Sequence, residues 1–419
     1  MKADVKQGYK QTEVGVIPED WEVRLLSQVA EIRGGVAKNS NVVVTEPISV
    51  HYLRVANVQD GFLDLSEMSK IELSRQDLKR YSVLPGDVLM NEGGDRDKLG
   101  RGSIWQGEFN PCVHQNHVFV VRCKSALLPD YLNLWTVARP ARNFFLLAGK
   151  QTTNLASISK SSLGELPVAL PPLPEQRAIA EALGDVDGLL GGLERLIAKK
   201  RDLKQAAMQQ LLTGQVRLPG FHGEWVVKRL GELADIRSGG TPSTTEPQFW
   251  DGEIPWCTPT DITALDGRKY LTETSRTITQ LGLKCSSAEM IPVNSIVMTS
   301  RATIGECAIN KVPVATNQGF KNFVPFETVD VEFLFYLLLT QKQGFISLCG
   351  GSTFLEIGKG QLTAFEVRLP QEKAEQAAIA AVLSDMDAEI AALEQRRDKT
   401  RALKQAMMQE LLTGRTRLI

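Results

Sequence analysis

The chain has 419 residues, of which 43% are hydrophobic and 23% charged, and its 48 Lys and Arg residues nearly balance 49 Asp and Glu residues. This composition is typical of globular proteins and excludes a disordered or collagen-like chain, while the length suggests roughly two to four domains. No apolar stretch approaches the roughly 18 to 20 residues of a membrane helix. Residues 1–10 are polar and the six cysteines include no C-x-x-C pair, so we expect a cytoplasmic protein with reduced thiols and no membrane contact.

The first predicted element is a mixed segment, residues 12–170. It contains a turn at Pro85-Gly86-Asp87, a strand at Val118 to Val121 and a helix near Pro129 to Phe145. Residues 219–370 show the same features in the same order, so we expect two α+β domains. The corresponding turn, strand and helix are Pro292-Val293-Asn294, Ile296 to Met298 and Val331 to Ile346.

A long helix is predicted after each mixed segment, beyond prolines between 167 and 174 and at Pro370. Hydrophobic residues then recur alternately four and three positions apart, which is the a/d stripe of a coiled coil. Each helix would run for about 60 Å to Gly214 or Gly414, where glycine can supply a left-handed cap. The stripe residues are Ile179, Leu183, Val186, Leu190, Leu193 and Ile197 in the first helix and Ile379, Leu383, Met386, Ile390 and Leu393 in the second.

The charge along each predicted helix indicates how the two helices pair. Residues 175–194 are mainly acidic and residues 195–214 mainly basic, and the second helix has the same polarity. An antiparallel pair sets acidic halves against basic halves, so we predict that orientation. The alternative is that the gradient only complements each helix dipole.

Small residues occur near the middle of both helices. Because glycine in a helix costs about 1 kcal/mol relative to alanine, the glycines of the first helix suggest a close backbone approach at the helix crossing, with a hinge as the alternative. These residues are Gly188, Gly191 and Gly192, which correspond to Ala388, Ala391 and Ala392.

The chain is an internal repeat. Residues 203–218 and 403–418 are identical at twelve of sixteen positions, and residues 21–35 resemble residues 225–239. The predicted fold is therefore α+β, with two similar domains separated by two long helices that form an antiparallel coiled coil with an internal pseudo-two-fold axis. DNA has matching symmetry, so such a chain can read two half-sites at a fixed spacing.

The motifs of common catalytic sites are absent from the sequence. It has no G-x-x-x-x-G-K-[ST] loop, no strand-linked G-x-G-x-x-G and no [DNS]-P-P-[YFW] tetrapeptide of amino-methyltransferases. Cys112, His114 and His117 resemble a metal cluster, but strand alternation would place the two histidines on opposite faces. The serines between 157 and 162 are interpreted as turn residues. We expect no catalysis, no cofactor and no metal.

Three sequence motifs occur in order along the chain. They are Tyr9-Lys10-x-Thr12-Glu13-x-Gly15-x-Ile17-Pro18-x-x-Trp21, Pro171-Pro172-Leu173-Pro174-Glu175-Gln176-x-x-Ile179-Ala180, and Leu-Leu-Thr-Gly at 211–214 and 411–414. Together with the duplication, they resemble the specificity subunit of Type I restriction-modification enzymes over nearly the whole chain. The second helix departs from the pattern at residues 370–376, where PQEKAEQ keeps only the Glu-Gln of PPLPEQ.

The resemblance implies a non-catalytic subunit that selects the DNA sequence on which other subunits act. Residues 1–170 and 216–370 would be target-recognition domains, each reading one half of a bipartite asymmetric site in double-stranded DNA. Residues 171–215 and 371–419 would be conserved helices that set the spacer. Two modification subunits, which methylate adenine, would dock on this subunit, and restriction-translocation subunits would join to cleave unmethylated DNA.

Candidate DNA contacts are polar residues that match between the two halves. Phosphate contacts need Lys or Arg, and base reading favours Arg on guanine and Asn or Gln on adenine. The alternatives are solvated loops and inward-facing strand residues, and Trp105, Trp256 and Phe354 are expected in the core. The candidates form three groups: Asn91, Arg96, Lys98 and Arg101 with Ser300, Arg301 and Thr303; Gln115, Asn116 and His117 with Asn317, Gln318 and Lys321; and Lys150, Gln151, Thr152 and Asn154 with Ser352, Thr353 and Lys359.

The overall charge argues against tight DNA binding by the chain alone. Its pI near 6.5 is below the value of about 9 that is common in DNA-binding domains, so local patches or the modification subunits would have to attract DNA. The competing interpretations are a duplicated coiled-coil adaptor that binds proteins, and a self-contained nuclease or methyltransferase.

Overall fold

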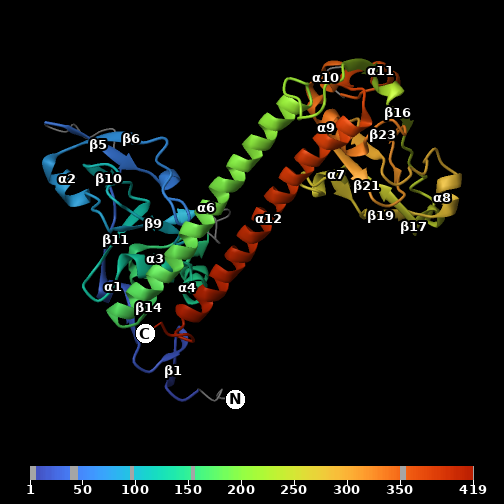
Figure 1. Cartoon of the computed structure of the whole chain (residues 1–419). Helices are drawn as coiled ribbons and strands as arrows, with labels where there is room; N and C mark the ends of the chain where they lie inside the picture. Colours follow the sequence, from blue (N-terminus) through green and yellow to red (C-terminus); the bar gives the residue numbers. More distant parts are fainter. Residues whose placement is uncertain (1–5, 38–45, 95–98, 152–155, 350–354, 419) are drawn as a thin grey trace. The chain divides into compact units, whose positions relative to one another are not determined.

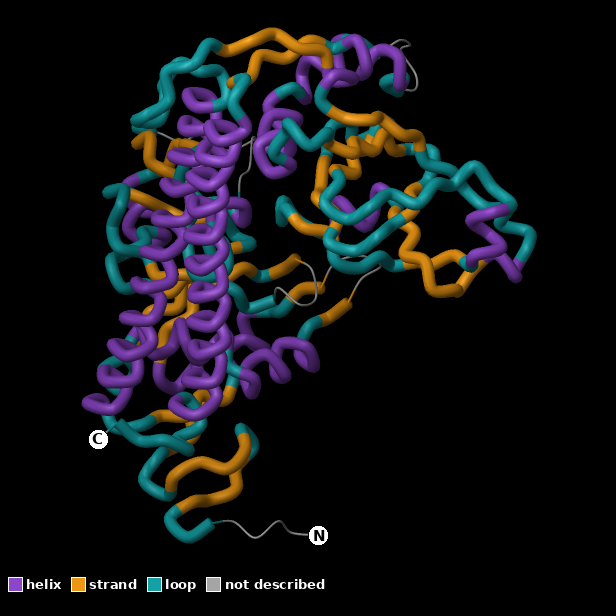
Figure 2. The backbone as a smooth tube through the Cα atoms, turned by 45° about the vertical axis from the view of Figure 1, so that its right-hand side comes forward, coloured by secondary structure: helices purple, strands orange, loops and turns teal. Residues whose placement is uncertain are grey.

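The structure, a computed structural model, describes residues 6–37, 46–94, 99–151, 156–349 and 355–418. These residues form two compact units, many of whose elements are labelled in Figure 1 and all of which are coloured by type in Figure 2. Unit 1 comprises the described residues of Met1–Leu193 and Arg396–Ile419, and unit 2 comprises those of Glu194–Gln395. No helix in these described ranges has both the length and the hydrophobicity that a membrane crossing requires.

Unit 1 is built on a four-stranded antiparallel sheet in the order β4 (Ala30–Arg33), β11 (Val118–Cys123), β7 (Val88–Asn91) and β9 (Gly102–Ile104). A second sheet has the order β10 (Cys112–His114), β5 (Ile48–Leu53) and β6 (Ser69–Leu73). The smaller sheets are β1 (Tyr9–Thr12) with β2 (Gly15–Pro18), β3 (Glu22–Leu25) with β14 (Pro167–Leu170), and β12 (Lys150–Gln151), β13 (Ala156–Ser157) and β8 (Gly93–Gly94). The short helices are α1 (Leu26–Val29), α2 (Arg75–Tyr81), α3 (Pro129–Val137), α4 (Arg139–Ala148) and α5 (Lys160–Gly164).

Unit 2 repeats this arrangement, which confirms the predicted duplication. Its main sheet has the order β16 (Ala234–Ser238), β23 (Phe320–Pro325), β20 (Ile296–Thr299), β21 (Cys307–Asn310) and an added strand, β18 (Tyr270–Leu271). The other sheets are β19 (Arg276–Ile278), β17 (Trp250–Cys257) and β22 (Ala315–Thr316), and β15 (Trp225–Arg229) with β24 (Glu366–Pro370). The short helices are α7 (Pro259–Ala264), α8 (Gln280–Lys284), α9 (Val331–Thr340), α10 (Lys342–Ser347) and α11 (Lys359–Ala364).

The main sheet of each unit separates two hydrophobic clusters. In β11, Phe119 and Val121 belong to one cluster, whereas Val118 and Val120 belong to the other. In β20, Met298 and Val297 are divided in the same way. Both predicted strands exist, and their continuous apolar runs are explained by burial on both faces.

The single helix predicted in each mixed segment is wrong in detail, because two helices are present in each. In unit 1 the chain is extended at Ala138, between α3 and α4. Pro140 follows two residues later, and proline has no N–H with which to continue the hydrogen bonds of α3. In unit 2, Gln341 separates α9 from α10.

The long helices are α6 (Leu173–Leu211) and α12 (Lys373–Leu411), each of 39 residues. In unit 1 the end of α12 packs against the start of α6, where Lys404 lies 2.6 Å from Asp187. In unit 2 the end of α6 packs against the start of α12, and Lys204 lies 2.5 Å from Asp387. The helices therefore pair antiparallel, as predicted, and basic halves contact acidic halves.

The a/d stripe lies on the inner side of this pairing. Val186, Met386 and Leu393 are half-buried, and the other eight stripe residues are buried. Gly188 and Gly192 do not make the predicted close approach, because a Cβ added at either residue would meet no atom within 4 Å. Both glycines lie on the open side of the helix. The predicted caps are confirmed by positive φ angles at Gly214 (73°) and Gly414 (68°).

A cluster of Glu, Arg and Trp attaches each long helix to the domain that precedes it, and we call it the Glu–Arg–Trp cluster. In unit 1, buried Glu175 accepts hydrogen bonds from Arg417 (2.5 and 2.8 Å) and from Nε1 of Trp21 (3.0 Å). In unit 2 the corresponding residues are Glu375, Arg217 and Trp225, at 2.6, 2.7 and 3.3 Å.

The Glu-Gln pair that survives in the second helix explains why both helices begin at the same relative position. Gln176 accepts from the Leu128 N–H at 2.9 Å, and Gln376 accepts from the Asp330 N–H at 3.0 Å. Each amide also donates to the carbonyl of a proline that precedes its helix. The Glu-Gln side chains therefore secure the helix start without the PPLP sequence.

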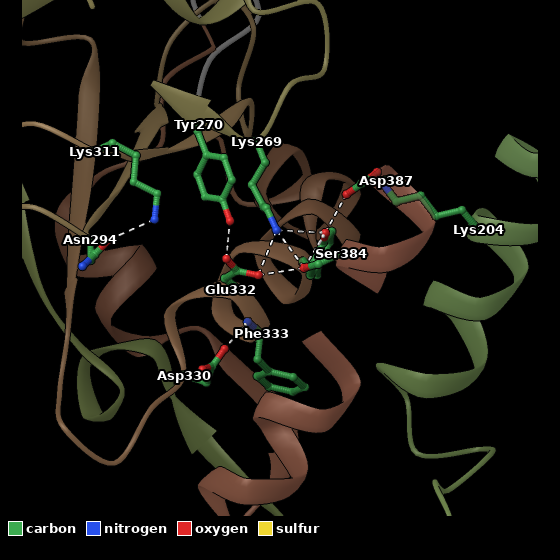
Figure 3. A network of polar contacts seen from close by, with 11 residues as sticks. Lys204, Lys269, Tyr270, Asn294, Lys311, Asp330, Glu332, Phe333, Ser384 and Asp387 are labelled. Atoms are coloured by element: carbon green, nitrogen blue, oxygen red, sulfur yellow. Dashed lines mark hydrogen bonds and ion pairs between the residues drawn. The ribbon is translucent and has the colours of Figure 1, made fainter. Parts of the chain in front are cut away.

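Unit 2 has a further polar network between the sheet and α12, shown in Figure 3. Lys269 donates to Glu332 at 2.8 Å and to Ser384 at 2.7 Å, and Tyr270 donates to the same carboxylate. Burial by itself would raise the pKa of Glu332, but the hydrogen bonds from Lys269, Tyr270 and Ser384 outweigh it and lower the pKa to about 2. In unit 1, Gly184 occupies the position that corresponds to Ser384.

Candidate nucleic-acid interface

In unit 1, the three segments that carry the predicted contact groups meet around Glu92, which follows β7. The Glu92 N–H donates to the His117 carbonyl at 2.9 Å, and the Glu92 carbonyl accepts from the Ile158 N–H at 2.8 Å. The Glu92 carboxylate lies 2.6 Å from Nδ1 of His117, whose Nε2 lies 3.2 Å from Nδ2 of Asn116. Lys150 is joined to this site through the small sheet of β12, β13 and β8.

In unit 2, the same junction forms around Ser300, which follows β20. The Ser300 N–H donates to the Gly319 carbonyl at 2.7 Å, and the Ser300 carbonyl accepts from the Ile357 N–H at 3.1 Å. The backbone contacts of Glu92 and Ser300 are therefore equivalent. The side chains around them differ, because Ser300 is buried and its Oγ lies 3.5 Å from Nζ of Lys321.

The charges of the unit 2 junction are partly paired. Arg301 is exposed and forms an ion pair of 3.0 Å with Glu356, to which it is also linked by a β-bridge. Lys321 is buried, and burial lowers its pKa. Gln318 and Thr303 are exposed beside these groups, while Asn317 accepts from the Gly319 N–H at 2.9 Å. Arg301, Thr303 and Gln318 are thus the exposed polar candidates of this junction.

Other candidates are engaged within the protein or lie elsewhere. Asn91 donates to the Val58 carbonyl at 2.8 Å, and Arg101 forms an ion pair of 3.3 Å with Asp60. Gln115 is half-buried, and Lys359 is exposed at the first residue of α11. Arg96, Lys98, Thr152, Asn154, Ser352, Thr353 and Phe354 lie outside the described residues, as does the side chain of Gln151. Trp105 and Trp256 are buried, as expected.

His114 has a structural role at the base of the unit 1 junction. It is buried, and its Nδ1 lies 2.6 Å from the Val118 carbonyl oxygen. Burial lowers the pKa of His114 to about 4, so it stays neutral near pH 7. Among the residues described, no three His, Cys, Asp or Glu side chains are grouped to hold a metal ion.

Comparison with known proteins decides the family. The model of the Type I restriction modification DNA specificity domain matches residues 18–199 and again residues 222–401. The chain belongs to this family. The two matches correspond to the two halves of the repeat, each with its domain and most of its long helix.

Relatives of this specificity family align with the chain over much or all of its length. A Methanocaldococcus jannaschii protein named as the MjaX type I restriction enzyme specificity subunit is 27% identical, covering 99% of this chain and 97% of its own. The Escherichia coli EcoR124I/EcoR124II specificity subunit is 28% identical, covering 55% and 57%. A solved structure from a study of complex assembly in the type I restriction-modification system has a TM-score of 0.63 at 18% identity, covering 96% and 99%, and so shares the fold.

Sequence reasoning about this specificity-family chain missed the acidic members of each junction. Glu92 and Glu356 are paired with His117 and Arg301, whereas the predicted DNA contacts include no acidic residue. The sequence carries a signal for Glu92, because it directly follows the predicted contact residue Asn91. An acid at a reading surface holds a cation in place and can also accept from cytosine N4.

Proposed function

We propose that the chain is the non-catalytic DNA-specificity subunit of a Type I restriction-modification complex and that each unit reads one half of a bipartite, asymmetric site. Residues 1–170 and 216–370 would be the two target-recognition domains, and residues 171–215 and 371–419 the conserved helices. Two modification subunits and the restriction-translocation subunits would assemble with it on double-stranded DNA. The catalytic steps would belong to those subunits.

The main support is the pair of equivalent junctions around Glu92 and Ser300. The same backbone contacts hold three segments together in each unit, whereas the side chains differ: Glu with His in unit 1, and Ser with buried Lys in unit 2. Base reading depends on the donors and acceptors that face the groove. Equivalent backbone contacts with different side chains therefore support the proposal that the two units recognise different half-sites.

The helices support the second part of the proposal, namely a fixed spacer. Each unit contains an antiparallel contact between the long helices, with the ion pair of Lys404 and Asp187 in unit 1 and that of Lys204 and Asp387 in unit 2. Paired helices resist bending more than a single helix does, which suits a spacer that keeps half-sites at one separation. We propose that their outer faces also dock the modification subunits.

Methylome sequencing tests the proposal. Cells that contain the chain and its modification subunits should methylate adenine within one split motif, which disappears when the gene for this chain is deleted. In cells expressing Arg301→Ala, selectivity should relax in one half of the motif only. An unchanged methylome after deletion would contradict DNA recognition and favour the adaptor interpretation, whereas equal loss at all sequences in Arg301→Ala would contradict a base contact.

A further inference from the structure

The loop after β16 in unit 2, residues 239–246, lies directly beside the candidate reading residues. The Gly240 N–H donates to the Thr316 carbonyl at 2.8 Å, and a Cβ added at Gly239 would lie only 2.0 Å from the Asn317 carbonyl oxygen. The hydroxyl of Thr241 donates to the side-chain oxygen of Gln318. This loop, which we call the hydroxyl loop, therefore extends the junction around Ser300.

Two buried tryptophans hold the hydroxyl loop from beneath. Trp256 Nε1 donates to the Gly240 carbonyl at 3.0 Å, and Trp250 Nε1 donates to the Ser243 carbonyl at 2.9 Å. Their rings meet edge to face, with centroids 4.9 Å apart. The buried indoles fix the loop at Gly240 and Ser243, and the hydroxyls of Ser243 and Thr245 lie 2.8 Å apart. The exposed residues Ser243, Thr244 and Thr245 therefore belong to an anchored segment.

An arginine lies over the same tryptophans. The guanidinium of Arg276 is 3.9 Å from the centroid of the Trp250 ring and 5.4 Å from that of Trp256. The residue is exposed, and within the described ranges it forms no ion pair with a carboxylate. Stacking holds the guanidinium and leaves its N–H edge available to an acceptor outside the chain.

Unit 1 has the same hydrogen bond from a strand residue to a loop carbonyl, but a different residue on the neighbouring strand. The Tyr52 hydroxyl donates to the Val36 carbonyl at 3.1 Å, just as Trp256 donates to that of Gly240. The strand pairing sets Ser69 opposite Tyr52, where unit 2 has Arg276 opposite Trp256. This hydrogen bond therefore forms in unit 1 without an arginine on the neighbouring strand, so the fold does not require Arg276 in unit 2.

We infer that Arg276 and the hydroxyl loop of unit 2 bind a phosphate of the DNA backbone beside the half-site that this unit reads. The inference rests on the proposed function. A fixed guanidinium and a row of hydroxyls are donors suited to phosphate oxygens, which are the same at every sequence. Arg276 would thus strengthen binding without selecting a base.

The test uses Arg276→Ser, which introduces the residue found in unit 1, in the complex with the modification subunits. DNA affinity is measured between about 50 and 200 mM salt on cognate and unrelated duplexes. We expect roughly tenfold weaker binding to both duplexes, a slope of log affinity against log salt reduced by about 0.9, and an unchanged methylation motif. Arg276→Lys should keep the slope.

The matched control is Arg268→Ala, which removes one charge from an exposed arginine of the same unit. The Arg268 guanidinium donates to the carbonyls of Leu265 and Ala264, so its loss should leave the salt slope unchanged. If Arg276→Ser binds like the wild type, or alters the motif in one half-site, the phosphate contact is refuted while the proposed function stands. If the wild-type complex binds no DNA, the proposed function itself fails.

Discussion

The Glu–Arg–Trp cluster of unit 1 leads to a prediction for Arg417→Met. Glu175 is fully buried, and its carboxylate has Arg417 and Trp21 as hydrogen-bond donors. Methionine keeps the apolar stem but leaves this carboxylate with the indole N–H alone. Removing one partner of a buried ion pair costs about 3 to 5 kcal/mol. Because 30% of the Arg417 side chain is exposed, water can partly replace it, so we expect a loss of about 2 to 4 kcal/mol.

A double-mutant cycle with Glu175→Gln measures the interaction. Glutamine removes the buried charge and keeps an acceptor for Trp21, so the double variant should be more stable than the sum of single effects by about 1 to 3 kcal/mol. Urea unfolding gives the free energies, and hydrogen exchange shows where stability is lost. Segments around Trp21 and the start of α6 should exchange faster in Arg417→Met.

The matched control is Arg217→Met, which removes the equivalent partner of Glu375 in unit 2. It should accelerate exchange around Trp225 and leave the segment around Trp21 unchanged. If the effects of Arg417→Met and Glu175→Gln add up to the effect of the double variant within about 0.5 kcal/mol, the two residues are energetically independent and the prediction is wrong. Equal acceleration in both units would also contradict it.

Gly188→Ala should raise the free energy of unfolding by about 1 kcal/mol, because the added methyl meets no neighbour and alanine favours a helix. Urea midpoints measure the change, and lower stability would show that the helix needs glycine there. Glu332, whose pKa falls from 4.5 to about 2 on folding, should contribute stability that is fully present above pH 4.5 and lost as the pH falls towards 2. This contribution is up to about 3 kcal/mol, so Glu332→Gln should show a shallower loss between those pH values, and equal slopes would contradict the assignment.

The duplication, the two long helices and their orientation could be predicted from the sequence because they depend on patterns that span many residues. The charge gradient along each helix and the a/d stripe leave few ways to pair two helices. The Gly188 prediction failed for a local reason. Helix propensity shows that glycine is costly there, but it does not show which side of the helix faces a neighbour, and Gly188 lies on the open side.

The sequence predicts which segments form the candidate site, but it does not predict which side chains pair within it. Polar residues in matching loops identified the segments that meet at Glu92 and Ser300, because loops after buried strands gather at a common edge. The partner of each side chain depends on register. Arg276 is opposite Trp256 only because β19 pairs with β17 at that register. The pairing is irregular between Trp250 and Ile254, and the periodicity of the sequence does not predict this irregularity.

Unit 2 is a continuous stretch of the chain, whereas unit 1 is completed by residues 396–418, which are synthesised after unit 2. Arg417 reaches Glu175 only after the whole of unit 2 has been synthesised. The nascent chain can therefore complete unit 2 before the buried Glu175 carboxylate of unit 1 gains its Arg417 partner. During translation, unit 1 would then begin before unit 2 and be completed after it.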